Sequence, residues 1–285
     1  MIAAERLEHI AETVCQKRAV SIADLSERFG VSQATIRRDL NKLEKQGILE
    51  RKYGGAVARR ASSFDVQTEA VPQRTSSLDA PFDVREQHHV AEKRAIALAA
   101  IELVSSGETI FLDAGTTIAQ LAHALRDHSD LTVITNSERV MNELYDCSGV
   151  TVVVTGGELR PLSGLPSRGD ICMVGPIAEE ILHRFRPSKA FLGTAGITVR
   201  EGMSNTNLPQ SQIKRIMAQI SEEVILLTDH TKFGHVSYSI VSPVDVLDQV
   251  ITDSGISSED KSALEERGIE VVVVEPFPNG LSSTV

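Results

Sequence analysis

Cysteine and long apolar runs are both scarce in this sequence. Its three cysteines, Cys15, Cys147 and Cys172, lie far apart and form neither a CxxC pair nor a cluster with histidine. This pattern argues against structural zinc and suits the cytoplasm. No apolar run approaches the roughly 18 residues of a membrane span. The N-terminal stretch MIAAERLEHIAET carries acids early and lacks the apolar core of a secretion signal, so we do not expect export.

Positive charge is also in deficit, but it is unevenly spread. The chain has 29 Lys and Arg against 39 Asp and Glu, a formal net charge of −10. Residues 1–60 carry a net charge of +4, and the remainder carries −14. A basic head on an acidic body indicates a polyanion-binding module joined to a part that needs no polyanion. Chance scatter over a short segment is the alternative interpretation.

The N-terminal segment has apolar residues at helical spacing. They predict one helix to about Lys17 and a second after Ser21, which is placed to cap it together with Asp24. Gly30 is expected to end the second helix, because glycine readily adopts the left-handed conformation that follows helix ends. The two apolar stripes consist of Ala3, Leu7, Ile10, Val14, Ile22, Leu25 and Phe29.

The stretch SQATIRRDLNKLEKQG, residues 32–47, predicts a third helix over residues 33–46 after a tight turn. Ser32 is placed to cap this helix. Its inner stripe is Ile36, Leu40 and Leu43. After Gly47, the run ILERKYGGAV predicts two short strands around a turn, which would form a wing.

This succession of elements is the layout of a winged helix-turn-helix, which we assign to residues 1–58. The third helix of such a domain lies in the DNA major groove with its N-terminal residues at the base edges. Arg37 and Arg38 are therefore placed to meet phosphates and guanine edges. A solvated face of a helical subdomain is the alternative. The expected DNA contacts are Ser32, Gln33, Thr35, Arg37, Arg38, Lys42, Arg51 and Lys52.

The pattern changes twice beyond residue 58. Residues 59–84 are assigned to a linker, because they are mostly aperiodic and rich in serine, proline and polar residues. A helix from Ala91 to Val104 then leads into short β-branched runs, and helical stretches or loops lie between most of them. The runs are TIFLD, LTVIT, VTVVV, KAFLG, EVILLTD, QVITD and EVVVV. They predict an α/β domain over residues 85–285, with a mainly parallel sheet covered on both faces.

The hexapeptide LDAGTT ends one expected strand and opens a helix. Gly115 would let the backbone approach an anion, while Thr116 and Thr117 add hydroxyl donors at a helix N-terminus. That combination suits a phosphate, although a glycine turn with a threonine cap is an equal alternative. The hexapeptide matches neither the dinucleotide fingerprint nor the GxxxxGK[ST] loop, so no NAD or ATP cofactor is expected.

Other expected strand ends carry similar chemistry. They supply Asn136, then Gly156, Gly157 and Arg160, and finally Asp229 and Lys232. In open α/β sheets, ligands bind beyond the carboxyl ends of the strands. Together these loops predict a pocket for a small phosphorylated polar molecule. His88 and His89 lack an acidic or cysteine partner at ligand spacing, so we expect them at the surface and expect no metal site.

Two sets of motifs resemble one family. VSQATIRRDLNKLEKQG with RKYGGAV resembles the DNA-binding head of DeoR/GlpR-type bacterial transcriptional regulators. FDVREQHHVAEKRAIALAA, FLDAGTT, VITNS, VTGGELR, FLGTAGI, IKRIM and LTDHTKFG resemble its sensor domain in the same order. The match runs from about Arg6 to Asp253. The resemblance implies a regulator, usually a repressor of a sugar-catabolism operon, whose effector is a sugar phosphate or related metabolite.

The sensor half is also similar to ribose-5-phosphate isomerase, in which a lysine on the helix before the phosphate loop contacts phosphate. Lys93 stands at the matching place. The chain departs from the family pattern in its long linker and in Gln210, where many members carry glutamate. The segment containing Arg168 and Asp170 is also unusual, and these two residues have no assigned role. The expected effector contacts are Lys93, Asp113, Gly115, Thr116, Thr117, Asn136, Gly156, Gly157, Arg160 and Lys232.

The leading hypothesis is a repressor that binds operator DNA as at least a dimer and releases it when a phosphorylated sugar binds. The main alternative is a sugar-phosphate isomerase with a nucleic-acid-binding head. Asp113, Asp229 and Lys232 could then supply acid–base chemistry. No compact acid-rich catalytic stretch is present, so we predict that the protein is not an enzyme and has no catalytic residues. A head that binds protein instead of DNA is a third possibility.

Overall fold

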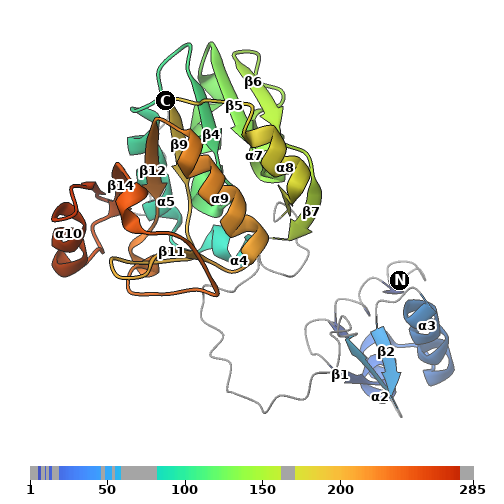
Figure 1. The fold of residues 1–285 in the computed structure, drawn as a ribbon. Coiled ribbons are helices and arrows are strands. Elements are labelled where there is room, and N and C mark those ends of the chain that lie inside the picture. The colour runs from blue at the N-terminus through green and yellow to red at the C-terminus, as the bar shows by residue number, and fades with distance from the viewer. Residues whose placement is uncertain are drawn as a thin grey trace. The chain divides into compact units, whose positions relative to one another are not determined.

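The computed structural model describes residues 6, 7, 10, 13, 14, 19–45, 49–52, 55–58, 82–161 and 171–276. The chain divides into two compact units, Met1–Pro72 and Gln73–Val285 (Figure 1). Each unit is described by itself below.

The first unit is a winged helix-turn-helix, as predicted. Helices α2 (Ile22–Phe29) and α3 (Gln33–Lys45) pack beside a three-stranded antiparallel sheet of order β1-β3-β2. Strands β2 (Leu49–Lys52) and β3 (Gly55–Ala58) form the predicted wing, whereas β1 (Ala19–Ser21) was not predicted. The buried core contains Ile10, Val14, Ile22, Leu25, Ile36, Leu40, Leu43 and Ala56.

Local hydrogen bonds explain where these helices begin and end. The Ser21 hydroxyl accepts a hydrogen bond from the Asp24 N–H at 3.0 Å, and Ser32 accepts one from the Thr35 N–H at 3.2 Å. Both predicted caps are therefore confirmed. Gly30 has a φ of 61°, the left-handed conformation expected after a helix.

Most of the predicted linker lies outside the described residues, but its last part differs from the structure. Helix α4 (Phe82–Gln87) already begins at Phe82, whose side chain is 1% exposed in the core of the second unit. The assignment of residues 82–84 to the linker is therefore wrong. The buried ring gives this short helix an apolar anchor that the polar residues around it do not reveal.

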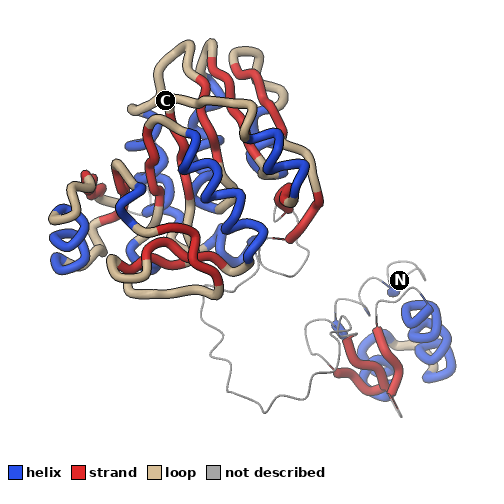
Figure 2. The backbone as a smooth tube through the Cα atoms, viewed as in Figure 1, coloured by secondary structure: helices blue, strands red, loops and turns tan. Residues whose placement is uncertain are grey.

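The second unit is built on a seven-stranded parallel sheet of order β15-β14-β12-β9-β4-β5-β6 (Figure 2). All seven predicted strands are present. They are β4 (Thr109–Leu112), β5 (Leu131–Thr135), β6 (Val150–Val154), β9 (Lys189–Leu192), β12 (Glu223–Leu227), β14 (Gln249–Asp253) and β15 (Glu270–Val274). Successive residues alternate between two buried clusters, one on each face, which explains why the strands are almost continuously apolar.

Helices cover both faces of this sheet. On one face lie α5 (Val90–Ile101), α6 (Thr116–Ala124) and α7 (Glu138–Leu144). On the other lie α8 (Pro176–Leu182) and α9 (Leu208–Ile220). Helix α10 (Ser258–Glu265) lies between β14 and β15 in the chain. The three-residue 3-10 helices are η2 (Leu125–Asp127), η3 (His230–Lys232) and η4 (Val244–Val246).

Two small antiparallel sheets were not predicted. Strand β7 (Glu158–Pro161) pairs with β8 (Ile171–Val174). Strand β11 (Gly202–Asn205) lies between β10 (Gly196–Thr198) and β13 (Ser239–Ser242).

All seven strands run parallel, but the order in which they are added to the sheet changes side at β4. Strands β5 and β6 extend the sheet to one side of β4, and β9, β12, β14 and β15 extend it to the other. The loops after β4 and β9 therefore diverge and leave a crevice at their carboxyl ends, where open α/β sheets bind ligands.

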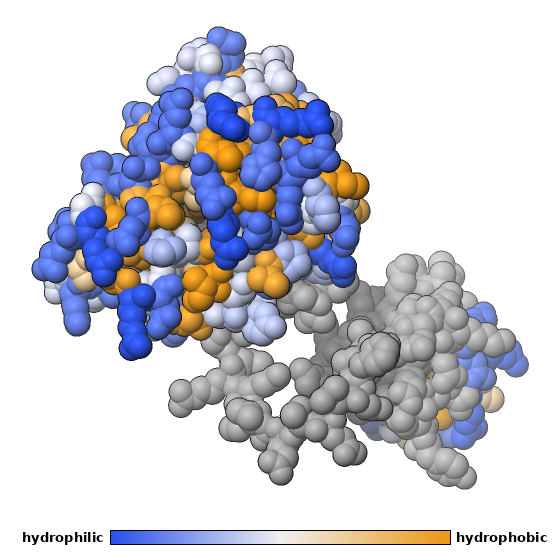
Figure 3. Space-filling model, viewed as in Figure 1, coloured by the Kyte–Doolittle hydropathy of each residue, from blue (hydrophilic) through white to orange (hydrophobic). Residues whose placement is uncertain are grey.

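In Figure 3 the described face of the second unit is mostly hydrophilic, and apolar residues gather in small separate patches. None of the described helices is long and apolar enough to cross a membrane.

Candidate functional site

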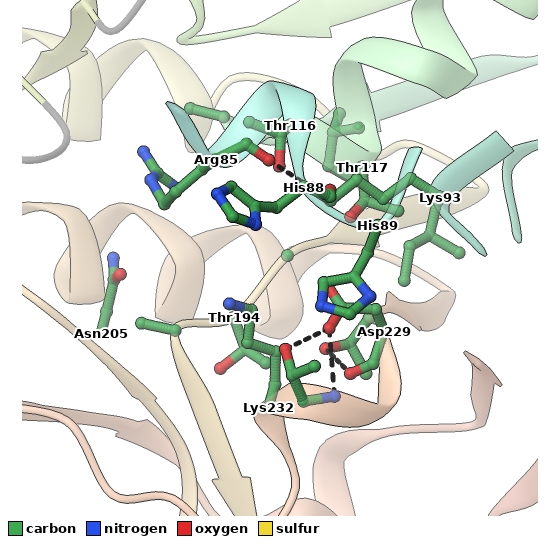
Figure 4. A pocket seen from close by; sticks show the side chains of 18 of the residues that line it. Arg85, His88, His89, Lys93, Thr116, Thr117, Thr194, Asn205, Asp229 and Lys232 are labelled. Atoms are coloured by element: carbon green, nitrogen blue, oxygen red, sulfur yellow. Dashed lines mark hydrogen bonds between the residues drawn. The ribbon is translucent and has the colours of Figure 1, made fainter. Parts of the chain in front are cut away.

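A cavity of about 220 Å³ lies at the crevice between β4 and β9. Its walls come from α4 and α5, from the loop that opens α6, from the segment after β9, and from η3. Figure 4 shows Thr116 and Thr117 on one side and Asp229 and Lys232 facing them, with His89 between. Five of the ten predicted effector contacts line this cavity: Lys93, Gly115, Thr116, Thr117 and Lys232.

The start of α6 borders the cavity. The first N–H groups of a helix have no acceptor within it, and the helix dipole favours negative charge there. Gly115 is the residue before α6, and a Cβ atom added to it would meet no heavy atom within 4 Å. Glycine thus leaves open space above the loop, and Thr116 and Thr117 follow directly as the first residues of the helix. The binding of a phosphate at this loop stays a prediction.

Besides Lys214, which is described below, the cations Arg85, Lys93 and Lys232 line the cavity together with one carboxylate, that of Asp229. Burial lowers the pKa of Lys93 to about 8, against the opposing charge of Asp229. The positive charges of Lys232 and Arg85 add to that lowering. Burial likewise lowers the pKa of Lys232, again with Asp229 opposing and Arg85 adding. Positive charge is therefore held close together at a buried place, an arrangement that an anionic ligand would stabilise.

Asp229 is fixed by its own segment. Burial by itself would raise the pKa of this carboxyl, but Lys232 and hydrogen bonds from Thr231 outweigh that effect and lower it. The Thr231 N–H donates to Asp229 Oδ1 at 3.1 Å, and the Thr231 hydroxyl donates to the same oxygen. Asp229 therefore remains a carboxylate at neutral pH.

Lys93 is tied to the end of α4. Its ammonium donates hydrogen bonds to the main-chain oxygens of Arg85 and His88, and its side chain is buried. Lysine has three N–H donors, so one remains for a ligand. The role of Lys93 as a phosphate contact stays a prediction.

A second buried cation, Lys214 on α9, also lines the cavity. Its ammonium contacts the carboxylate of Asp113, which lies at the end of β4. Asp113 is 1% exposed and lies beneath the cavity rather than in its wall. The predicted direct contact between Asp113 and an effector therefore needs correction, because Asp113 acts as the partner of Lys214.

The two neighbouring histidines, His88 and His89, both border the cavity. His88 is exposed and His89 is half-buried. His89 has a φ of 53°, and its ring packs edge-on against that of His230 with centroids 5.3 Å apart. The surface prediction is confirmed for His88, whereas His89 is half-buried in the turn between α4 and α5 that borders the cavity. Among the described residues, no group of three or more His, Cys, Asp or Glu side chains is arranged to hold a metal ion.

Four predicted effector contacts lie outside this cavity: Asn136, Gly156, Gly157 and Arg160. They follow β5 and β6, whereas the crevice opens between β4 and β9. Asn136 is buried and donates to the Met173 main-chain oxygen at 3.2 Å, and Arg160 pairs with Glu158 at 3.0 Å on the surface. Grouping all the strand ends into one pocket was therefore wrong: β6 lies two strands from β4, and Asn136, although it follows the neighbour of β4, is buried against Met173. Arg168 and Asp170 lie outside the described residues.

Sequence reasoning missed several residues that line the cavity. They are Arg85, Thr194, Asn205 and Lys214. Thr194 and Lys214 belong to FLGTAGI and IKRIM, so a signal was present without an assigned role. Asn205 reaches the crevice from β11, a strand that lacks a long β-branched run.

Six of the eight predicted DNA contacts in the first unit lie on α3 or directly before it. Ser32, Gln33, Arg37, Arg38 and Lys42 are exposed and Thr35 is half-buried, whereas the opposite side of the helix packs into the core. Arg51 and Lys52 belong to β2, and their side chains lie outside the described part of the structure.

A winged helix-turn-helix with an exposed polar helix face, joined to an α/β unit with a cationic cavity, defines the class: a DNA-binding transcriptional regulator with a sensor domain. The chain belongs to the DeoR family of these regulators. A model of the DeoR C-terminal sensor domain matches residues 88–254, and a model of the DeoR-like helix-turn-helix domain matches residues 6–61.

Similar proteins span nearly the same length. An uncharacterized HTH-type regulator of Bacillus subtilis, YulB, is 36% identical and covers 96% of this chain and 98% of its own. A putative aga operon transcriptional repressor of Escherichia coli O157:H7 is 34% identical over 95% and 93%. The glycerol-3-phosphate regulon repressor of Escherichia coli K12 is 33% identical over 88% and 90%. Ribose 5-phosphate isomerase A from Neisseria gonorrhoeae is 19% identical over 51% and 53%, with a TM-score of 0.36.

Proposed function

We propose that this regulator is a repressor whose second unit binds a small phosphorylated sugar or related metabolite, and that this binding releases operator DNA from the first unit. The names of two relatives, an aga operon repressor and a glycerol-3-phosphate regulon repressor, support an operon of carbohydrate or polyol breakdown. The expected compartment is the cytoplasm, where such operons are transcribed.

The observation that carries the proposal is the charge around the start of α6. Arg85, Lys93 and Lys232 bring three positive charges to the cavity wall, and Asp229 brings one negative charge. This predominance of positive charge favours a phosphate monoester, which carries about −1.5 to −2 at pH 7. The phosphate is proposed to bind at the N-terminus of α6, where Gly115 leaves open space.

The size and chemistry of the cavity support binding of a small metabolite. Its volume of about 220 Å³ is below the roughly 300–1,000 Å³ of pockets for drug-sized ligands. An isomerase would need a carboxylate base facing the ligand. Among the described lining residues the one carboxylate is Asp229, and Thr231 already occupies one of its oxygens. This supports a binding role over the isomerase alternative.

Release requires that the effector bind the DNA-incompetent state more tightly than the competent one. Winged helix-turn-helix heads of this type bind paired half-sites, so the working form is proposed to be at least a dimer. The two states are proposed to differ in the segment that joins the two units.

A thermal-shift screen of phosphorylated sugars tests the proposal directly. A true effector at 100 times its Kd should stabilise the sensor domain by about 2.7 kcal/mol. The same compound should weaken binding to an operator selected from random duplexes, and it should not be turned over. Stabilisation without any change in DNA affinity would remove the repressor mechanism, and robust isomerisation of ribose 5-phosphate would favour the enzyme.

Effector affinity is expected to depend on pH through Lys93. Its pKa of about 8 in the free protein means that Lys93 loses its charge as the pH rises above about 8. A bound phosphate favours the charged form, so binding should take up a proton near pH 8, and affinity should fall by up to roughly tenfold per pH unit above it. Calorimetry in buffers of different ionisation enthalpy measures both effects.

Lys93→Gln is the matched control for this pH profile. The variant should bind the effector more weakly at pH 7 and show no further loss between about pH 8 and pH 9. If the wild-type profile were flat over that interval and Lys93→Gln bound the effector as tightly as the wild type at pH 7, Lys93 could not be a phosphate contact.

A further inference from the structure

The cavity contains a second kind of cation, one whose charge is already matched. The Lys214 ammonium donates to Asp113 Oδ2 and, at 2.9 Å, to the Gly193 main-chain oxygen. The side chains of Lys214 and Asp113 are only 4% and 1% exposed. This pair adds no net charge to the cavity, in contrast to the positive cluster beside α6.

Asp113 depends on Lys214 for its neutralisation. Its Oδ2 also accepts a hydrogen bond from the Gly193 N–H at 2.9 Å, and its Oδ1 has no hydrogen-bond partner among the described residues. The two contacts of Lys214 use two of its three N–H donors, which leaves one for a ligand in the cavity that Lys214 lines. A donor backed by a carboxylate can hold a neutral oxygen, whereas a ligand anion there would also face the negative charge of Asp113.

We propose that Lys214, with its charge masked by Asp113, determines the specificity of the effector cavity. It binds an uncharged oxygen of the effector and makes the site reject a second anionic group. The inference rests on the proposed function, because it assumes that a phosphate occupies the start of α6. The favoured ligand class is then a monophosphate with a neutral hydroxylated end, as opposed to a bisphosphate or a phosphorylated sugar acid.

Two probes of nearly the same size test this rule. Glycerol 3-phosphate and 3-phosphoglycerate share a three-carbon phosphate skeleton, but one ends in a hydroxymethyl group and the other in a carboxylate. Calorimetry with the full chain should show that the wild type binds glycerol 3-phosphate at least roughly tenfold more tightly. If the wild type bound 3-phosphoglycerate as tightly as glycerol 3-phosphate, or more tightly, this measurement alone would overturn the inference.

Two substitutions should move this preference in opposite directions. Asp113→Asn unmasks Lys214 and should shift the ratio of the two dissociation constants toward 3-phosphoglycerate by roughly tenfold. Lys214→Gln removes the cation but keeps the negative charge of Asp113, so it should shift the ratio further toward glycerol 3-phosphate. If the pair had a purely structural role, each substitution would weaken the binding of both probes equally. The inference would be overturned if both substitutions shifted the ratio of dissociation constants in the same direction, or if neither changed it.

The double variant D113N/K214Q is the control for stability, because replacing both members of a buried ion pair is tolerated better than removing one. The ratio of its dissociation constants for glycerol 3-phosphate and 3-phosphoglycerate should return close to the wild-type ratio. Inorganic phosphate serves as the third probe and separates the two proposals. If the wild type binds none of the three probes, the phosphate site itself fails. If it binds phosphate but neither three-carbon probe, or binds all three without discrimination, only the role of Lys214 fails.

Discussion

Replacing Gly115 by valine is expected to leave the protein folded and able to bind its operator, while its response to the effector is lost. A Cβ at this position would meet no protein atom within 4 Å, so the substitution has room within the protein. That room is the space in which a phosphate would approach the first N–H groups of α6. A branched side chain would occupy it, and effector affinity should fall at least roughly 100-fold, about 2.7 kcal/mol.

Three measurements on Gly115→Val check this. Effector affinity should fall, operator affinity without effector should match the wild type, and the free energy of unfolding should change by no more than about 1 kcal/mol, as for a cap position. Gly115→Ala should give an intermediate loss of effector affinity. Full retention of the effector response by the valine variant would place the phosphate elsewhere.

Arg160→Ala is the matched comparison, because Arg160 follows β6 and the structure puts it outside the cavity, in an exposed ion pair with Glu158. It should respond to the effector like the wild type. A loss of response in this variant would instead support the sequence-based grouping of all the strand ends into one site.

The strands and the turn at Gly115 could be predicted because their signals are local. Strands buried on both faces are apolar at almost every position, and the turn at Gly115 carries its chemistry within a few residues. The order of strands in the sheet is not a local property. Gly156 follows β6, which lies two strands from β4, and Asn136 follows the adjacent β5 but is buried with its amide turned to Met173, so neither lines the cavity.

Lys214 and Arg85 illustrate a second limit. Whether a helical lysine faces solvent or a cavity depends on which helix face meets the sheet, and α9 turns Lys214 toward Asp113, a residue 101 positions away in the chain. Arg85 enters the cavity because the ring of Phe82 anchors α4, with the guanidinium of Arg85 5.6 Å from the ring centroid. No spacing rule within either helix reveals these long-range partners.

Arg38→Ala is expected to weaken operator binding by about 1–3 kcal/mol, roughly five- to 150-fold, if the arginine reads a base edge. Arg38 is exposed on α3, and the buried stripe of Ile36 and Leu40 holds the other side of the helix in the core. Its neighbour Arg37 is also exposed, but its guanidinium contacts Gln33 at 3.4 Å on the same helix. Arg38 is therefore the better candidate for direct recognition.

The salt dependence of binding separates the two roles that Arg38 could play. A contact to phosphate contributes about 0.9 to the slope of log affinity against log salt, and its loss affects all sequences equally. A base contact leaves that slope nearly unchanged and relaxes preference at one position of the operator. Arg38→Lys sharpens the test, because lysine keeps the charge but loses the bidentate geometry that matches guanine. If the alanine variant kept both the affinity and the slope of the wild type, Arg38 would lie outside the DNA interface, and α3 would have to read its operator through Gln33 and Arg37.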